Sequence, residues 1–195
     1  MRSSERKGTE ADASGAAIPV HERLAADIGV SLYASLASPG RILDHFRREA
    51  ERALELTRRL PQEAAARPVR IRRFPGIEAE SRHWSVYMTL DHLVMVNSAI
   101  TALIHAICSG HTQGVEIRLD DVRPHADAGA DRIVALEALV DRYAHQIDCL
   151  GILQSRARHP HPWLGPLTAR QWHALAALHN RVHRVQIEKI VRRLD

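Results

Sequence analysis

Apolar residues recur every three or four positions along four long segments of the chain, the spacing that places them on one face of a helix. The first segment, residues 39–60, follows Ser38, which supplies an N-cap, and it has proline at the first helical position. Pro61 ends the segment, because proline lacks the N–H that a helix interior needs. These features predict the first core helix.

The second segment, residues 85–109, is apolar over far more than half of its circumference and ends at Gly110. Its most apolar run, 93–108, is interrupted by Asn97 and His105. This run is shorter than the roughly 20 residues that a membrane span needs. We therefore expect a fully buried helix of a soluble protein, with no membrane contact.

The third segment, residues 131–154, alternates spacings of three and four between its apolar positions, which is typical of a bundle seam. The fourth, residues 168–194, opens with a capping box formed by Thr168 and Gln171. Four long helices joined by connections of varied length predict an all-α four-helix bundle.

A looser apolar pattern over residues 20–36 predicts an extra helix before the bundle. Residues 1–17 are rich in Ser, Glu, Ala and Gly without an apolar run, so we expect a disordered tail and no signal peptide. Residues 18–195 then form a single domain. Two connections, 61–83 and 155–167, are expected to be irregular; the arginines of the first bind an anion or lie in a solvated loop.

Composition agrees with one soluble globular domain, since 45% of the 195 residues are apolar and 26% are charged. The formal charge of +4 comes from arginines scattered among acidic residues, so we expect a solvated surface and no nucleic-acid partner. Cys108 and Cys149 lie in apolar helical patterns without a CxxC motif. We expect both to be free, buried thiols of a cytoplasmic protein.

The candidate chemistry lies in the fourth segment, where polar residues occupy the middle of the apolar face. These residues are His179, His183 and Gln186. Imidazoles at positions i and i+4 of a helix lie about 5–6 Å apart and point the same way. That arrangement suits two bonds of about 2.0–2.1 Å to one metal ion. His92, beside the apolar seam of the second segment, is the candidate third ligand, although a lone histidine there is usually a hydrogen-bonded core residue.

These histidines stand in a setting that resembles the DinB/YfiT-like superfamily. The stretch 84–93, W-S-V-Y-M-T-L-D-H-L, contains His92, and residues 161–168, H-P-W-L-G-P-L-T, introduce the helix with His179 and His183. In that superfamily, one histidine of the second helix and two of the fourth form a three-histidine site for a divalent metal. The resemblance spans essentially the whole predicted bundle.

The resemblance implies a Zn, Ni, Mn or Fe ion at one end of the bundle, with coordination positions open to water or substrate. Members of the superfamily include transferases and isomerases that use low-molecular-weight thiols, iron-dependent sulfoxide synthases, and stress-associated proteins, and dimers are common. We therefore expect a metal-dependent transferase or hydrolase that uses a low-molecular-weight thiol or other small molecule, and a homodimer. The alternative is a non-enzymatic metal-binding stress-response or scaffold protein of the same fold.

Four further residues are candidates for the surroundings of the metal. Gln186 orients a ligand or caps the site by hydrogen bonding. Asn97 is a pocket residue or a buried amide bonded to backbone. His161, between two prolines, is expected to lay its loop on the fourth helix, and Trp163 lines a pocket or belongs to the core.

Other histidines are not expected to reach the site. His105 lies about 20 Å along the helix from His92, too far to share its ion. His145 and His173 point away from their seams, and we expect them in solvent. No glycine-rich elbow surrounds a serine, and apolar settings raise the pKa of a cysteine thiol, so nucleophilic catalysis by a protein group finds no support.

Overall fold

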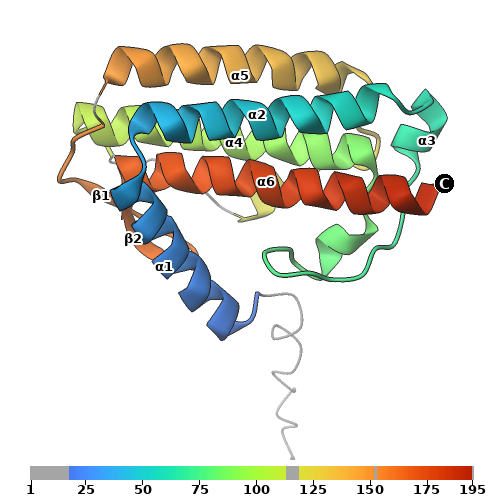
Figure 1. The fold of residues 1–195 in the computed structure, drawn as a ribbon, viewed down its shortest axis with the longest axis horizontal. Coiled ribbons are helices and arrows are strands. Elements are labelled where there is room, and N and C mark those ends of the chain that lie inside the picture. Colours follow the sequence, from blue (N-terminus) through green and yellow to red (C-terminus); the bar gives the residue numbers. More distant parts are fainter. Residues whose placement is uncertain (1–17, 113–118, 152, 195) are drawn as a thin grey trace, which may run out of the picture.

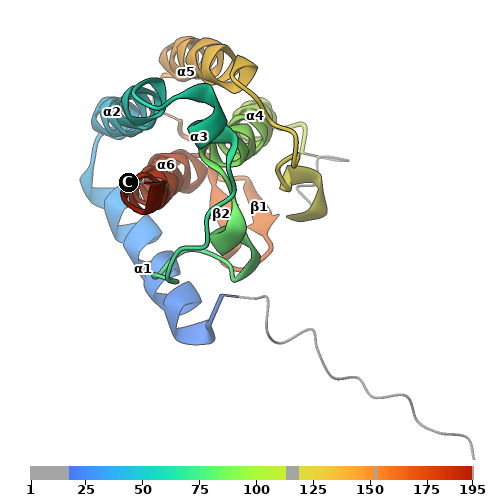
Figure 2. The same ribbon diagram turned by 90° about the vertical axis from the view of Figure 1, so that its right-hand side faces the viewer.

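The structure is a computed structural model that describes residues 18–112, 119–151 and 153–194. Four long helices lie side by side in it: α2 (Pro39–Arg58), α4 (Val86–Ser109), α5 (Asp131–Leu150) and α6 (Ala169–Leu194). Seen end-on, α6 is the inner helix, with α2 and α4 beside it and α5 packed on α2 and α4 (Figure 2). The predicted all-α four-helix bundle is confirmed, whereas the predicted tail, 1–17, lies outside the described residues.

Local sequence signals set the ends of the first two bundle helices. The hydroxyl of Ser38 accepts a hydrogen bond from the backbone N–H of Arg41 at 3.3 Å, as the N-cap of α2. Ser85 caps α4 in the same way through the N–H of Met88 at 3.1 Å. At its other end Gly110 adopts φ 74°, the left-handed conformation that favours glycine.

Helix α4 is the one helix of the described chain that is long and apolar enough to cross a membrane. Core helices of soluble proteins pass the same test of length and composition. Here α4 packs against both α5 and α6 and carries a row of fully buried residues that includes Leu90 and Leu93. The expected full burial is wrong, since Ser98, Ala102 and His105 on another face of α4 are exposed.

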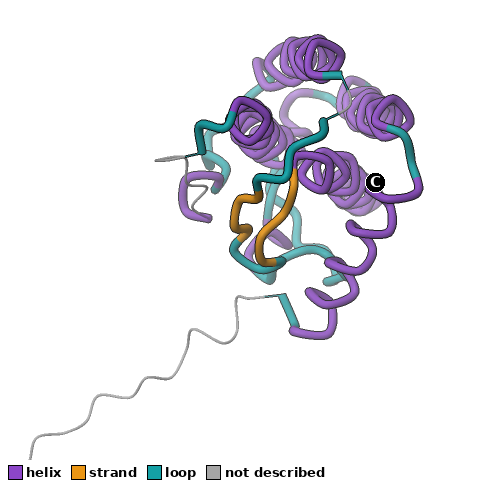
Figure 3. Tube along the Cα trace, turned by 90° about the vertical axis from the view of Figure 1, so that its left-hand side faces the viewer, coloured by secondary structure: helices purple, strands orange, loops and turns teal. Residues whose placement is uncertain are grey.

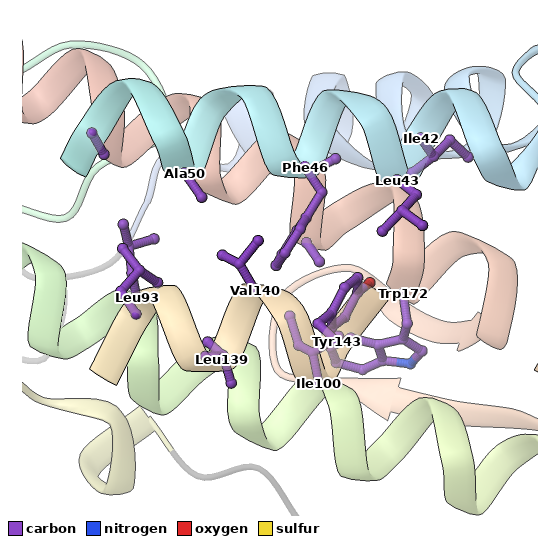
Figure 4. Packing of buried hydrophobic residues seen from close by; sticks show 14 of the residues in the cluster. Ile42, Leu43, Phe46, Ala50, Leu93, Ile100, Leu139, Val140, Tyr143 and Trp172 are labelled. Atoms are coloured by element: carbon purple, nitrogen blue, oxygen red, sulfur yellow. The ribbon is translucent and has the colours of Figure 1, made fainter. Parts of the chain in front are cut away.

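The core between the helices is built around aromatic stacking. Phe46 of α2 and Tyr143 of α5 stack with their ring centroids 4.1 Å apart (Figure 4). Aliphatic side chains of α4 and α5, including Leu93, Ile100 and Val140, fill the space around them. Stacking of buried rings stabilises a core beyond the burial of their surface.

Helix α5 ends at Leu150, four residues earlier than the sequence pattern indicated, because Gly151 with φ 65° leaves the helix there.

Helix α6 begins where its capping box places it. The side chain of Gln171 accepts from the backbone N–H of Thr168 at 3.0 Å, and Thr168 Oγ1 accepts from the N–H of Gln171 at 3.3 Å.

The expectation that His173 is solvated is wrong, since this residue is fully buried. Its ring lies between Tyr143 and the carbonyl of Pro39, because α6 is covered by α2 and α4 on one side and by α1 on another.

The expected extra helix is α1 (Val20–Leu36), which crosses α6 at an angle to the bundle (Figure 1). It buries Val30 and Ala34 against the core. The apolar residues whose period predicted the helix lie on its outer face; these are Val20, Leu24, Ile28, Leu32 and Leu36, all at least half exposed. Their spacing therefore predicts the helix but not the face that it buries.

The connections are more regular than expected. Residues 61–83 contain α3 (Gln62–Ala66) and a 3₁₀ helix, η1 (Glu80–His83), and a second 3₁₀ helix, η2 (Leu119–Val122), follows α4. The expected polar loop before α6 forms an antiparallel hairpin of β1 (Arg158–His161) and β2 (Gly165–Thr168), shown in Figure 3. Two arginines of the first connection, Arg73 and Arg82, bond to Glu22 and to the carbonyl of Ile71.

The cysteines differ from their predicted state in one respect. Both thiols are free, but Cys149 is exposed on α5 and Cys108 is only partly buried. Their expected burial is therefore wrong for Cys149, because no helix of the described chain covers the outer face of α5.

Candidate metal centre

Three imidazoles from two helices, α4 and α6, lie close together. His92 of α4 and His179 and His183 of α6 each offer one ring nitrogen, and these three nitrogens lie within 4.8 Å of one another. The Nε2 atom of His179 is 3.2 Å from that of His92 and 3.1 Å from that of His183. The structure thus brings together the three residues that the sequence predicts as ligands.

These separations suit a shared ion. Two ligands bonded to one ion at about 2.0–2.1 Å, at a tetrahedral angle, lie about 3.3 Å apart. The two Nε2–Nε2 distances that involve His179, 3.2 and 3.1 Å, fall close to this value. No carboxylate or thiol joins the group within the described ranges, so a bound ion would keep coordination positions for water or another molecule.

The ring of His92 is oriented by a backbone carbonyl. Its Nδ1–H donates to the carbonyl oxygen of Val122 at 2.6 Å. A carbonyl oxygen only accepts, so the proton of the neutral ring lies on Nδ1 and the lone pair of Nε2 points to the other histidines. The loop that supplies Val122 is held by Asp91, whose buried carboxylate accepts from the backbone N–H of His125 and from Arg132.

The ring of His183 is oriented by Gln186. Nδ1–H of His183 donates to Oε1 of Gln186 at 2.7 Å. The amide group of Gln186 donates from Nε2 to the carbonyl oxygen of Ser81, also at 2.7 Å. Because Ser81 takes the amide N–H, the amide oxygen faces His183 and fixes its tautomer. The Nε2 lone pair of His183 therefore faces the cluster as well.

A single proton on His179 cannot form hydrogen bonds to both of the neighbouring imidazoles. Nε2 of His179 carries one hydrogen at most, whereas Nε2 of His92 and Nε2 of His183 both offer lone pairs to it. The Nδ1 atom of His179 is buried without a hydrogen-bond partner in the part of the chain described, so this ring is placed by its helix position and its packing. A cation bound by all three Nε2 atoms resolves the conflict between the lone pairs.

Burial keeps the three imidazoles neutral. It lowers the pKa of His92 to about 4. Burial also lowers the pKa values of His179 and His183 well below the usual value, and repulsion by the neighbouring imidazoles lowers them further. Metal ions bind neutral imidazole, so these rings are ready to act as ligands at neutral pH without losing a proton.

A cavity of about 490 Å³ opens beside the cluster, between α1, α4, α6, the hairpin and residues 75–78. Its wall includes the three histidines and Trp84, Trp163 and Trp172, which are all of the tryptophans in the chain. The ring of Trp84 lies 4.9 Å from that of His92 between centroids. The open side of the histidine cluster therefore faces a largely apolar cavity.

The remaining candidates divide between the core and the cavity. Asn97 is buried away from the cavity wall, and its Nδ2 donates to Oδ1 of Asn180 at 2.8 Å. Nδ1 of His161 accepts from the backbone N–H groups of Trp163 and Leu164 within its own hairpin turn, and His161 also lines the cavity. Trp163 lines the cavity under the guanidinium of Arg23, 5.9 Å from its ring centroid.

Several residues that shape the site were missed from the sequence. Val122 and Ser81 contribute backbone carbonyls, which leave no trace in a residue pattern. Asp91 could have been found, since an acidic residue on the buried side of an apolar helix needs a partner. Trp84 was noted only as part of a motif.

Comparison with known proteins supports the fold. No protein family matches the chain, and no curated protein matches it. Among solved structures it is similar to TT2238, described as a four-helix bundle protein, with a TM-score of 0.53 and 17% sequence identity. The match covers 77% of this chain and 98% of TT2238. At this identity the likeness concerns the bundle alone, and it carries nothing about the histidines.

Proposed function

We propose that this protein binds a divalent metal ion through His92, His179 and His183 and that it is a metal-dependent enzyme of the DinB/YfiT-like type. The observation that carries the proposal is the convergence of three Nε2 atoms within 4.8 Å. Two of these atoms have their lone pairs fixed by hydrogen bonds at Nδ1. Such partners hold ligand histidines in place in known metal sites.

The donor set bounds the ion and the reaction. Neutral imidazole suits Zn, Fe and Ni, and Mn remains a candidate from the family resemblance. A divalent ion held in this way would lower the pKa of a water or thiol bound to it, and so favour its nucleophilic form near neutral pH. The histidines hold the site, Gln186 and Val122 orient them, and the apolar cavity limits access by bulk water. We therefore propose thiol transfer or hydrolysis as the reaction, with a low-molecular-weight thiol as one possible partner.

A turnover screen tests the proposed activity. The pure protein would be reconstituted separately with Zn²⁺, Ni²⁺, Mn²⁺ and Fe²⁺ and assayed for thiol transfer to 1-chloro-2,4-dinitrobenzene and for hydrolysis of p-nitrophenyl esters. We expect turnover with at least one ion, lost in His183→Ala and kept in His105→Ala, whose side chain is exposed on α4. Equal turnover in both variants would contradict catalysis at this site.

The second candidate is a non-enzymatic metal-binding protein, in stress response or as a scaffold. It is favoured by the cavity wall, which offers few groups besides the histidines that could act as an acid or base; Glu78 is one. Stoichiometric metal without turnover in the screen would select this candidate. Cytoplasmic location, the homodimer and the lack of nucleic-acid or membrane partners stay predictions from the sequence, and sedimentation velocity measures the oligomeric state.

A further inference from the structure

We infer that the cavity beside the three histidines binds a compact, uncharged, ring-bearing molecule with one oxygen, nitrogen or sulfur donor atom. The placement of that donor atom against the histidines rests on the proposed metal site. The choice of an uncharged ring rests on the cavity wall alone. The cavity, at about 490 Å³, has the size of a small-molecule site.

The wall is apolar and aromatic. Trp84, Trp163 and Trp172 contribute flat ring surfaces from three different parts of the chain. Aliphatic side chains of α1, α4, α6 and the loops cover the space between them, among them Val30, Ile77, Val96, Ile100 and Leu175. Aromatic walls favour flat apolar ligands, because ring stacking adds to the free energy gained from burying apolar surface.

The charged groups of the cavity wall already have contacts within the protein. The carboxylate of Glu22 accepts two hydrogen bonds from Arg73, at 2.8 and 2.7 Å. Arg23 donates from Nε to the carbonyl oxygen of Ile18 and places its guanidinium over Trp163. Arg123 pairs with Glu80 at 3.3 Å. Glu22 and Arg123 thus have partners of opposite charge, whereas the charge of Arg23 meets only a backbone carbonyl and a ring.

The remaining ionisable groups of the wall favour their neutral forms. Burial raises the pKa of Glu78, and it lowers the pKa of His161 to about 4. In the metal-free protein a charged ligand in this cavity would lose its hydration, and Arg23 is the one cation of the described wall without an acidic partner. Since burial of an unpaired charge is costly, the cavity selects against such ligands.

One polar contact lies on the wall apart from the metal centre. Nδ1 of His161 accepts from two backbone N–H groups, those of Trp163 and Leu164, at 3.1 and 3.2 Å. The proton of its neutral ring therefore lies on Nε2, which has no hydrogen-bond partner among the residues that the structure describes. This N–H can donate to a carbonyl, hydroxyl or ether oxygen of the ligand. The tryptophan rings of the wall thus match the ring of the proposed ligand, and the Nε2–H of His161 can bond to its oxygen.

Calorimetric titration with 2-naphthol, an uncharged bicyclic ring with one oxygen donor, tests the inference. The comparison probes are 2-naphthalenesulfonate, which keeps the ring and adds a charge, and glucose, which is uncharged but polar. We expect 2-naphthol to bind at least about tenfold more tightly than either, because each mismatched group costs more than about 1.4 kcal/mol on burial. Equal or tighter binding of the sulfonate to the metal-free protein would overturn the inference.

Gly29 of α1 offers a variant that fills the cavity and leaves the core intact. It lines the cavity, and a Cβ added there meets no atom within 4 Å. Gly29→Phe replaces a poor helix former and places a ring in the cavity, so we expect the affinity for 2-naphthol to fall about tenfold or more. Gly40→Phe is the matched control, since Gly40 also has open space around it but lies on α2 outside the cavity.

Both titrations are made on the metal-free and the metal-loaded protein, with helical content followed by circular dichroism. Binding of 2-naphthol to the metal-free protein that is lost in Gly29→Phe supports the cavity even if no metal binds. Metal binding without any 2-naphthol binding, or equal affinity in Gly29→Phe and Gly40→Phe, overturns the inference and leaves the proposed metal site standing.

Discussion

Gln186 and His183, one turn apart on α6, form a hydrogen bond of 2.7 Å in which the imidazole Nδ1–H donates to the amide oxygen. The amide cannot turn over, because its N–H donates to the carbonyl of Ser81 at the same distance. The pair therefore sets which nitrogen of His183 faces the cluster. Among the four residues that the sequence suggested around the metal, Gln186 is the one that forms a hydrogen bond to a proposed ligand.

Gln186→Leu should weaken metal binding without removing a ligand. The variant leaves Nδ1 of His183 without an acceptor, so the ring loses its fixed orientation and tautomer. We expect the metal affinity to fall about 10- to 100-fold, the usual effect of losing such a partner. Competition with a coloured chelator measures the affinity. Gln146→Leu is the control, because Gln146 donates to the carbonyl of Thr101 on another part of the bundle; equal losses in both variants would contradict the orienting role.

His173 should make stability depend on pH below neutrality. Burial lowers its folded pKa to about 4 from the ordinary value of 6.5, so the unfolded chain takes up the proton first as the pH falls. The stability present above pH 6.5 is then lost toward pH 4. From pH 7 to pH 5 this amounts to about 2 kcal/mol for one residue, at about 1.4 kcal/mol per pH unit.

The variant His173→Phe isolates this effect. At pH 7 it is expected to be less stable than the parent protein, because Tyr143 loses its partner. It lacks the titrating ring, so the difference in free energy of unfolding should narrow by about 2 kcal/mol between pH 7 and pH 5. Urea unfolding at several pH values measures the difference. A difference that stays constant over this range would show that His173 is not buried as a neutral ring.

Asn180→Ala should destabilise the bundle more than Asn97→Ala. Asn180 both accepts from Asn97 and donates to the carbonyl of Phe46 at 3.2 Å, so its loss removes two buried hydrogen bonds and leaves Nδ2 of Asn97 unpaired. Oδ1 of Asn97 already lacks a partner among the described residues, so its removal relieves one unpaired atom. We expect losses of about 3 and about 1.5 kcal/mol in the free energy of unfolding. Equal losses in chemical denaturation would argue against this asymmetry.

The sequence predicted the bundle because its apolar spacing and its end signals agree. Ser38, Ser85 and the Thr168–Gln171 box each form the cap that their position indicates. The hairpin before α6 was missed because Pro160 and Pro166 lie opposite each other in it, and prolines in a short polar stretch are typical of loops.

The site was predictable where a polar side chain interrupts an apolar face. His179 and His183 stand out for this reason, and His92 was found beside the apolar seam of the second helix. His173 was misjudged because the face of a helix at the centre of a bundle cannot be assigned from its own period when neighbours cover it on several sides. The acceptor at Val122 depends on tertiary structure alone, since any residue can supply a backbone carbonyl.

The central claim is that His92, His179 and His183 hold one divalent ion, and inductively coupled plasma analysis of the protein, reconstituted and then desalted, tests it most directly. We predict about one ion per chain in the parent protein and in His105→Ala, and far less in His179→Ala and His183→Ala, because two remaining imidazoles bind an ion only weakly. The absence of stoichiometric metal from the parent protein after reconstitution with Zn²⁺, Ni²⁺, Mn²⁺ or Fe²⁺ would contradict the claim.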